Sequence, residues 1–189
     1  MEELIKLDHQ LFLYLNGLGS ETYDGFWMFI TNKWGAIPLY IILLVLCFWK
    51  LGWKKTLLVL GMVGLLIAGA DQLANVFKYG FKRLRPCYTL NITDQMRLVK
   101  DWCGGQYSYF SAHSSNSFAV ALFFGMLFKP YFKWLLPVLI VWSLAVGYSR
   151  IYIGVHFPGD VLTGFFFGAI IALLVFKLYK VLVVKFRLE

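Results

Sequence analysis

Charged side chains are scarce in this sequence, and their scarcity excludes an ordinary soluble domain. Of the 189 residues, 15% are charged, 60% are hydrophobic and 19% are aromatic. A soluble domain of this size has more polar surface to cover. The apolar residues come in long runs rather than in amphipathic stripes, a pattern typical of helices that cross a membrane.

Several other features are missing as well. The sequence has no internal repeat, low-complexity stretch or linker, so we expect one domain over residues 1–189. Its acidic start, residues 1–8, lacks the apolar core of a cleavable signal peptide. No cluster of metal ligands occurs, and we expect neither a metal nor a cofactor. The formal net charge is +8, but no nucleic-acid-binding signature accompanies it, so nucleic acid is not an expected partner.

The apolar runs predict an all-α, integral-membrane helical bundle. A spanning helix needs roughly 20 mostly apolar residues, and about five such helices fit, with six as the alternative. The predicted spans cover residues 34–50, 56–80, 114–128, 132–150 and 161–182. The first can extend back toward Phe26, and the third becomes long enough if it runs from about His113 to Pro130.

Hydrophobic residues also recur at helical spacing before the first span, which predicts an amphipathic segment at the membrane surface. They are Leu4, Leu7, Leu11, Phe12 and Leu15. Aromatic residues at the ends of the spans fit an interfacial position. They are Trp34, Trp49, Trp53, Tyr131 and Trp134.

Lysine and arginine in the short connections predict the orientation of the bundle. Cytoplasmic loops of membrane proteins carry an excess of these residues. On one side of the predicted bundle lie Lys50, Lys54, Lys55, Lys129, Lys133, Lys177, Lys180, Lys185 and Arg187. We therefore expect this side to face the cytoplasm and residues 82–113 to face outward.

The three cysteines agree with this topology. Cys47 lies in the first span, where we expect an inert buried thiol. Cys87 and Cys103 both lie in the outward segment, and in an oxidising exterior we predict that they form a disulfide. Closing that loop would stabilise the fold by about 3 kcal/mol. Two free thiols are the alternative.

Three polar segments lie at the outward ends of the spans, where charged residues are costly and usually functional. In the first segment, Lys78 and Arg85 are seven residues apart, so a helix would place them on one face. Pro86 would end that helix directly after Arg85. Two cations at a helix end suit a phosphate, and snorkelling interfacial cations are the alternative.

The second segment, residues 109–117, places polar residues before an apolar span, as at a helix N-terminus. Free backbone N–H groups and the helix dipole favour an anion there. Ser111 can add a hydroxyl donor, and His113 can exchange a proton near neutral pH. A capping cluster with an incidental histidine is the alternative.

The third segment, residues 149–160, brings Arg150, His156 and Asp160 to one membrane boundary. Pro158 suits the first turn of a new helix. His156 and Asp160 are four residues apart, so the carboxylate can reach the imidazole and orient it. This is the arrangement of a nucleophile, His156, beside the group that orients it, Asp160. Arg150 adds a third cation to Lys78 and Arg85.

Together the three segments resemble the type 2 phosphatidic acid phosphatase superfamily. The family pattern is Lys-x6-Arg-Pro, then Pro-Ser-Gly-His, then Ser-Arg-x5-His-x3-Asp. The first and third parts match in full, at Lys78, Arg85, Pro86, Ser149, Arg150, His156 and Asp160. The second matches at Ser111 and His113 but has Phe110 for proline and Ala112 for glycine. Glycine there would permit a positive φ or a close backbone approach, which alanine restricts.

The resemblance implies a membrane lipid phosphatase that needs no metal and forms a phosphohistidine. His156 would be the nucleophile, Asp160 would fix its tautomer, and His113 would protonate the leaving oxygen. The phosphoryl oxygens would be held by three cations, a hydroxyl and nearby backbone N–H groups, at Lys78, Arg85, Arg150, Ser111 and Ala112.

A site at the outer membrane boundary favours a lipid phosphate over a soluble ester. Undecaprenyl diphosphate, phosphatidylglycerophosphate, phosphatidate and the phosphates of lipid A all fit. We expect an envelope lipid of a bacterial inner membrane, with the site facing the periplasm or the exterior. The sequence leaves the oligomeric state open.

Two alternative functions remain. The first is an enzyme like the vanadium-dependent haloperoxidases, which hold vanadate in a similar constellation. The second is a transporter or binding protein for a lipid phosphate, with Asp71, Gln72 and Asn75 of the second span as a proton relay. An interhelical polar contact is the simpler interpretation of those three residues.

Overall fold

The computed structural model describes residues 2–100 and 102–188, and every regular element in these ranges is a helix. The α-helices are α1 (Glu2–Gly17), α2 (Glu21–Thr31), α3 (Ile37–Phe81), α4 (Ala112–Phe128), α5 (Leu135–Tyr152) and α6 (Pro158–Lys185), and the 3₁₀ turns are η1 (Lys33–Ala36) and η2 (Pro86–Tyr88). The predicted all-α fold is thus confirmed.

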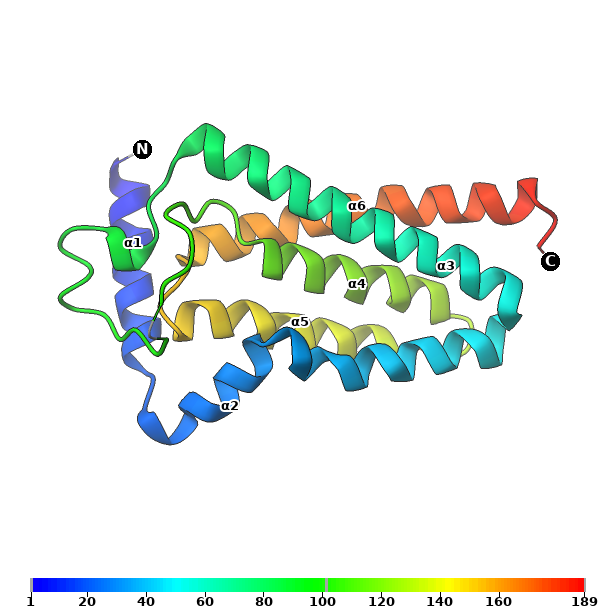
Figure 1. Cartoon of the computed structure of the whole chain (residues 1–189), viewed down its shortest axis with the longest axis horizontal. Coiled ribbons are helices and arrows are strands. Elements are labelled where there is room, and N and C mark those ends of the chain that lie inside the picture. Colours follow the sequence, from blue (N-terminus) through cyan, green and yellow to red (C-terminus); the bar gives the residue numbers. More distant parts are fainter. Residues whose placement is uncertain (1, 101, 189) are drawn as a thin grey trace.

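Helix α3 consists of two arms that run in opposite directions (Figure 1). The arms meet at Gly52, whose φ of 75° and ψ of 170° lie outside the helical region. Glycine reaches this conformation without the steric cost that a Cβ atom would bring. The two arms contain the second predicted span and all of the first except residues 34–36, which belong to η1, and Gly52 makes the sharp turn between them.

Among the described residues, three helical segments are long and apolar enough to cross a membrane: residues 34–81, which include both arms of α3, then α5 and α6. Helix α4 is a shorter apolar helix that lies along them (Figure 1). The fourth span was predicted to start at residue 132, but the helix that forms it, α5, begins three residues later, at Leu135. Before it, the backbone N–H groups of Tyr131 and Phe132 both bond to the carbonyl of Phe128 and form a turn.

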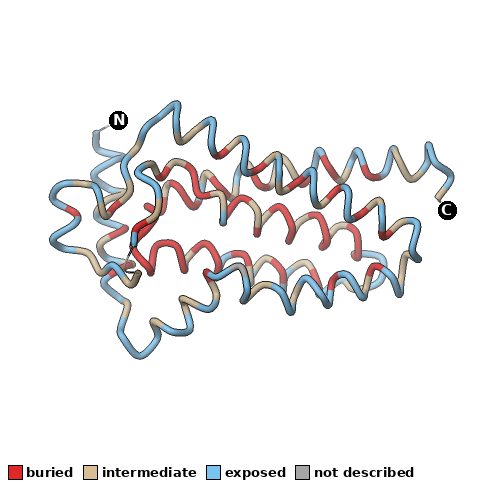
Figure 2. The backbone as a smooth tube through the Cα atoms, in the orientation of Figure 1, coloured by how far each residue is buried: buried red, intermediate tan, exposed pale blue. Residues whose placement is uncertain are grey.

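Helix α4 is the most buried helix of the bundle and packs against α3, α5 and α6 (Figure 2). Small residues permit its close contact with α6. A side chain at Gly168 would meet the backbone of Ser115, and one at Gly164 would meet the carbonyl of Ser111. Membrane helices associate through such small residues because lipid supplies no hydrophobic force between them.

The outer faces of the bundle are exposed (Figure 2), and many of their side chains are large and apolar. Large apolar side chains on these faces include Ile41, Ile42, Val45, Phe48, Val138, Val141, Leu162, Phe166, Leu173, Leu174 and Val181. A soluble protein rarely exposes a continuous apolar surface of this kind. Lipid is the environment that such a surface requires.

Helix α1 lies across one end of the bundle, and α2 leads from it to α3 (Figure 1). The predicted amphipathic segment is therefore helical, with Leu4 and Leu7 exposed and Phe12 buried. Helix α2 was not predicted. The turn at Gly52, the α4–α5 connection and the C-terminal end of α6 all lie at the opposite end of the bundle (Figure 1). These are the connections that carry the lysines expected to face the cytoplasm.

Candidate active site

The three polar segments converge on one cavity at the α1 end of the bundle. The cavity has a volume of about 450 Å³. The predicted site residues on its wall are Lys78, Arg85, Ala112, His113, Arg150 and His156. Asp160 lies behind His156, and Ser111 is fully buried away from the wall. The fold thus assembles a polar site from α3, α4, α5 and the loops beside them.

The prediction that one helix carries both Lys78 and Arg85 is wrong. Helix α3 ends at Phe81, and Lys82 follows in the left-handed conformation with φ 50° and ψ 30°. Arg85 lies beyond this end in an extended backbone conformation, with φ −71° and ψ 158°. Helical spacing therefore does not explain why Lys78 and Arg85 meet.

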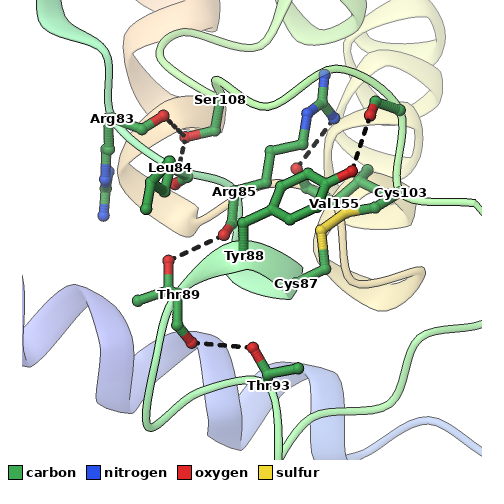
Figure 3. The surroundings of a disulfide bond; sticks show 11 residues. Arg83, Leu84, Arg85, Cys87, Tyr88, Thr89, Thr93, Cys103, Ser108 and Val155 are labelled. Atoms are coloured by element: carbon green, nitrogen blue, oxygen red, sulfur yellow. Dashed lines mark hydrogen bonds between the residues drawn. A yellow bond between two sulfur atoms is a disulfide. The ribbon is translucent and has the colours of Figure 1, made fainter.

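Backbone pairing brings Arg85 to the cavity instead. Its N–H group donates to the carbonyl of Gln106 at 3.1 Å, and the N–H of Ser108 donates to the carbonyl of Arg83 at 2.8 Å. The two ends of the outward segment thus lie side by side, as Figure 3 shows around Ser108. The Arg85 guanidinium then donates through Nη1 to the carbonyl of Val155, next to His156, at 3.2 Å.

The predicted disulfide between Cys87 and Cys103 is present, with their Cα atoms 6.5 Å apart (Figure 3). It joins the start of the outward segment, two residues after Arg85, to its later part. Cys47 is a free, buried thiol, as predicted. The disulfide and the backbone pairing therefore restrain the same segment from two sides.

Arg150 is held at the end of α5 by the loop that follows it. Its carbonyl accepts the N–H groups of Val155 at 3.1 Å and His156 at 3.3 Å. The chain can turn back because Gly154 adopts a φ of 84°. The Arg150 guanidinium donates through Nη1 to the hydroxyl of Thr31 at the end of α2.

The cations of the site lack acidic partners. None of Lys78, Arg85 and Arg150 forms an ion pair within 4.0 Å anywhere in residues 2–100 and 102–188. The Nε atoms of Arg85 and Arg150 are buried and have no hydrogen-bond partner in the same ranges. Leaving such donors unpaired is costly, so the cavity is suited to an anion with several acceptor oxygens.

A fourth cation, Lys100, lies in the outward segment within electrostatic reach of this site. Burial, and then the positive charges of Arg150 and Arg85, lower the pKa of its ammonium group. The sequence segments singled out earlier did not include Lys100. Its proximity depends on how the disulfide-linked segment folds over the helix ends, and no local pattern reveals that.

His156 and Asp160 make the predicted contact. His156 Nδ1 lies 3.4 Å from Asp160 Oδ2, and the same oxygen accepts the N–H of Phe157 at 3.0 Å. Helix α6 begins at Pro158, as predicted, which places Asp160 in its first turn. Burial, and then the charges of Arg85, Arg150 and Lys78, lower the pKa of His156 well below its ordinary value. The imidazole is therefore neutral at pH 7 and has a free electron pair.

The second segment forms a helix start, as predicted. Ser111 is the N-cap residue of α4, and its hydroxyl accepts the N–H of Ser114 at 3.4 Å. Its hydroxyl thus serves the helix and does not line the cavity. Ala112 is the first residue of α4 and has a negative φ, so this position needs no glycine for its backbone conformation.

Asp71 and Asn116 form a polar pair on the cavity wall. Asn116 Nδ2 donates to Asp71 Oδ1 at 2.8 Å and connects α4 to the second arm of α3. Asp71 thus makes an interhelical polar contact, which was the simpler of the two interpretations of this residue. Sequence inspection did not single out Asn116, although a polar residue one turn after His113 within an apolar helix was the available signal.

Comparison with known proteins agrees with the site. The sequence matches the PAP2 superfamily over residues 52–183. It is 36% identical over 183 residues to a lipid A 4′-phosphatase of Porphyromonas gingivalis, which is 95% of this chain and 75% of that protein. It is 34% identical over 170 residues to a lipid A 4′-phosphatase of Bacteroides thetaiotaomicron, with 89% and 75% covered.

A solved structure has the same fold. It is the crystal structure of a transmembrane PAP2-type phosphatidylglycerolphosphate phosphatase from Bacillus subtilis. The two chains superpose with a TM-score of 0.72 at 23% identity, over 98% of this chain and 88% of the other. This likeness establishes the shared helical bundle.

Proposed function

The chain belongs to the PAP2 superfamily and is a phosphoric ester hydrolase, and we propose that residues 1–189 form one membrane-embedded domain that dephosphorylates an envelope lipid through a phosphohistidine at His156. One observation carries the proposal. Three cations, which have no acidic partner within residues 2–100 and 102–188, and two histidines line one cavity, and the buried guanidinium groups of Arg85 and Arg150 suit a polyvalent anion there. A phosphate supplies the acceptor oxygens that this arrangement requires.

In the first step, the substrate phosphate is held by Lys78, Arg85 and Arg150. The contact with Asp160 occupies Nδ1 of His156, so Nε2 is the nitrogen that attacks phosphorus. The P–N bond forms as the bond from phosphorus to the lipid oxygen breaks. His113 gives a proton to that oxygen, and Asp160 stabilises the positive charge that develops on the imidazole.

In the second step, water attacks the phosphorus of phospho-His156. His113, now neutral, accepts a proton from this water, and the P–N bond breaks as inorganic phosphate forms. The three cations stay in place throughout and stabilise the charge on the equatorial oxygens. Because fixed side chains supply this charge, we expect turnover to persist in excess chelator.

The surroundings of the cavity support a lipid substrate. A second cavity, of about 300 Å³ and lined almost entirely by apolar side chains, lies between the two arms of α3. Tyr40 and Ile67 belong to the walls of both cavities. A phosphate in the polar cavity can therefore have its hydrocarbon tail beside the arms of α3 without crossing water.

Of the candidate lipids, we favour a phosphate of lipid A. Two relatives at 34–36% identity are lipid A 4′-phosphatases. The pair of Asp71 and Asn116 on the cavity wall offers hydrogen bonds to hydroxyl or amide groups of a sugar, which a prenyl chain cannot use. The remaining candidates are undecaprenyl diphosphate, phosphatidylglycerophosphate and phosphatidate.

The protein is an integral membrane protein, and we place it in the inner membrane of a bacterium with the cavity facing the periplasm. The lysine-rich connections at the opposite end of the bundle support this orientation. A disulfide beside the cavity supports an oxidising compartment on that side.

Phosphate release from a panel of purified lipids tests the function. The protein in detergent is given each of the four candidate lipids with excess chelator, and inorganic phosphate is measured with malachite green. We expect release from lipid A phosphate to be the fastest and His156→Ala to release none. Absence of release from every lipid would instead favour a carrier, and bromide oxidation with added vanadate would favour the haloperoxidase-like alternative.

A further inference from the structure

The Asp160 carboxylate contacts Arg83 in addition to His156 and the N–H of Phe157, and Arg83 connects it to the N-terminal helix. Asp160 Oδ1 accepts a hydrogen bond from Arg83 Nη1 at 2.9 Å. Arg83 Nη2 donates to Asp8 Oδ2, on α1, at 2.6 Å. The other oxygen of Asp8 accepts the N–H of Gly159 at 2.8 Å, in the first turn of α6. Two carboxylates from opposite ends of the chain thus share one guanidinium.

The neighbours of Arg83 fix its orientation. Its guanidinium carbon lies 4.3 Å from the centre of the Phe157 ring, between His156 and the start of α6. The His9 ring stacks on Phe157 with the ring centres 4.7 Å apart. The side chain of Arg83 is 24% exposed and that of Asp8 is 15% exposed, whereas that of Asp160 is fully buried. The network therefore runs from the protein surface to the buried carboxylate.

We propose that Arg83 and Asp8 are positioning residues that hold the Asp160 carboxylate in place and keep its negative charge available to His156. The inference rests on the proposed function, in which Asp160 orients His156 and stabilises its positive charge. Neither Arg83 nor Asp8 lines the cavity that contains Lys78, Arg85 and Arg150, so neither is placed to hold the phosphate, and we expect both to act through Asp160.

Geometry gives the first reason. A buried carboxylate needs partners for both oxygens, and the N–H of Phe157 and the imidazole of His156 occupy only Oδ2. The planar guanidinium of Arg83 fixes Oδ1 while its other nitrogen is fixed by Asp8. Arg83 thereby helps to fix the carboxylate plane, and with it the direction of the bond to His156 Nδ1, together with the Ser108 side chain, which also bonds to this carboxylate.

Charge gives the second reason. Arg83 paired with Asp160 alone would cancel the negative charge that stabilises the imidazolium during attack. Asp8 shares the guanidinium, so the three groups together carry one net negative charge. The attraction between Asp160 and the developing charge on His156 is therefore preserved.

The ion pair of Arg97 and Asp24 serves as a control that distinguishes positioning of Asp160 from simple attachment of a surface helix. Arg97 Nη2 and Asp24 Oδ2 are 3.0 Å apart and connect the outward segment to α2, with side chains 31% and 25% exposed. This pair resembles Arg83 and Asp8 in chemistry and burial but does not contact Asp160. Loss of either ion pair removes a contact that holds a surface helix. Only the loss of Arg83 also removes a partner of Asp160.

The experiment compares Asp8→Asn, Arg83→Gln and the double variant with Arg97→Gln, by kcat and KM for release of phosphate from a lipid phosphate. We expect Arg83→Gln to lower kcat by about 30-fold and Asp8→Asn by about fivefold, with KM changed by less than about twofold. The double variant should lose no more than Arg83→Gln alone, because Asp8 acts through Arg83. Arg83→Lys should recover part of kcat, and Arg97→Gln should keep it.

Three results would overturn the inference: an unchanged kcat in both single variants, a rise in KM with kcat intact, or an equal loss in Arg97→Gln. If Arg83→Gln does not fold, Asp8→Asn decides the matter, because asparagine keeps the shape and the acceptor for Gly159. His156→Ala is measured in parallel. Activity in that variant would refute the proposed function itself, whereas an inactive His156→Ala beside an unchanged kcat in both Asp8→Asn and Arg83→Gln would refute only the inference.

Discussion

Arg83 and Arg85 are two residues apart, yet their side chains point in different directions (Figure 3) and have different partners. Arg83 contacts two carboxylates, those of Asp8 and Asp160. Arg85 meets no carboxylate in the described ranges; its Nη1 donates to a carbonyl, and its buried Nε has no partner there. Both side chains are cations, so charge alone does not distinguish their roles. The difference is that two carboxylates neutralise Arg83, which supports the site, whereas Arg85 contacts no carboxylate in the described ranges and is proposed to bind the ligand. We expect substitutions to reveal this distinction in the kinetics.

The largest effect should come from His156, where the two environments meet. His156→Ala removes the proposed nucleophile, and we expect kcat to fall by about 10⁴-fold or more. Rapid-quench experiments with a substrate labelled on its phosphate should show an acid-labile phosphoenzyme in the unsubstituted protein and none in His156→Ala. A labelled enzyme that persists in His156→Ala would place the nucleophile elsewhere.

Arg85→Gln should have the next largest effect. Removing one donor from a preorganised anion site costs about 10²- to 10³-fold in turnover. Because Arg85 is proposed to hold the phosphate itself, inhibition by inorganic phosphate should also weaken. Arg83→Gln should leave that inhibition constant unchanged. Equal weakening in the two variants would contradict the distinction between the two arginines.

The pH dependence of kcat/KM should show the effect of the Arg85 charge on His156. The pKa of His156 lies well below the ordinary value of 6.5, so the imidazole stays neutral and nucleophilic as the pH falls past 6.5. The acidic limb of kcat/KM should therefore lie below pH 6.5. Arg85→Gln removes a positive charge that opposes protonation, so the pKa of His156 rises and the limb moves to higher pH. A limb that moves to lower pH in this variant would contradict the electrostatic account.

Ala112→Gly should have the smallest effect. Ala112 starts α4 with a negative φ, so glycine is not required there for the backbone conformation. We expect kcat and KM to change by less than about threefold and stability to fall by about 0.5–1 kcal/mol, the cost of glycine in a helix. A large gain in activity on one lipid would show that Ala112 restricts the headgroup.

Local sequence patterns predicted much of the site. The His156 and Asp160 contact follows from a spacing of four residues with Pro158 between them, which are short-range features. The two cysteines paired as expected because both lie in one outward segment. The position of Ser111 at a helix start was also predicted, although its hydroxyl turned out to cap the helix and not to face the cavity.

Long-range contacts escaped prediction. Arg85 reaches the cavity through backbone pairing with Gln106, which lies 21 residues further along the chain, and not through the helix that its spacing from Lys78 suggested. Asp8 and Arg83 are 75 residues apart, and no periodicity connects an amphipathic helix to a buried carboxylate. Asn116 met Asp71 only because α4 packs against the second arm of α3.

The amino-acid sequence by itself determined the bundle of apolar helices, the three polar segments at one end and the family they resemble. These properties depend on hydrophobic runs and on residue types at short spacings, which the chain carries before it folds. Tertiary structure alone decided which cations are paired and which are free, because that depends on the carboxylates that other segments bring near. Arg83 and Arg85 are the same residue type in the same segment, and only the positions of Asp8 and Asp160 make one a support and the other a candidate ligand for phosphate.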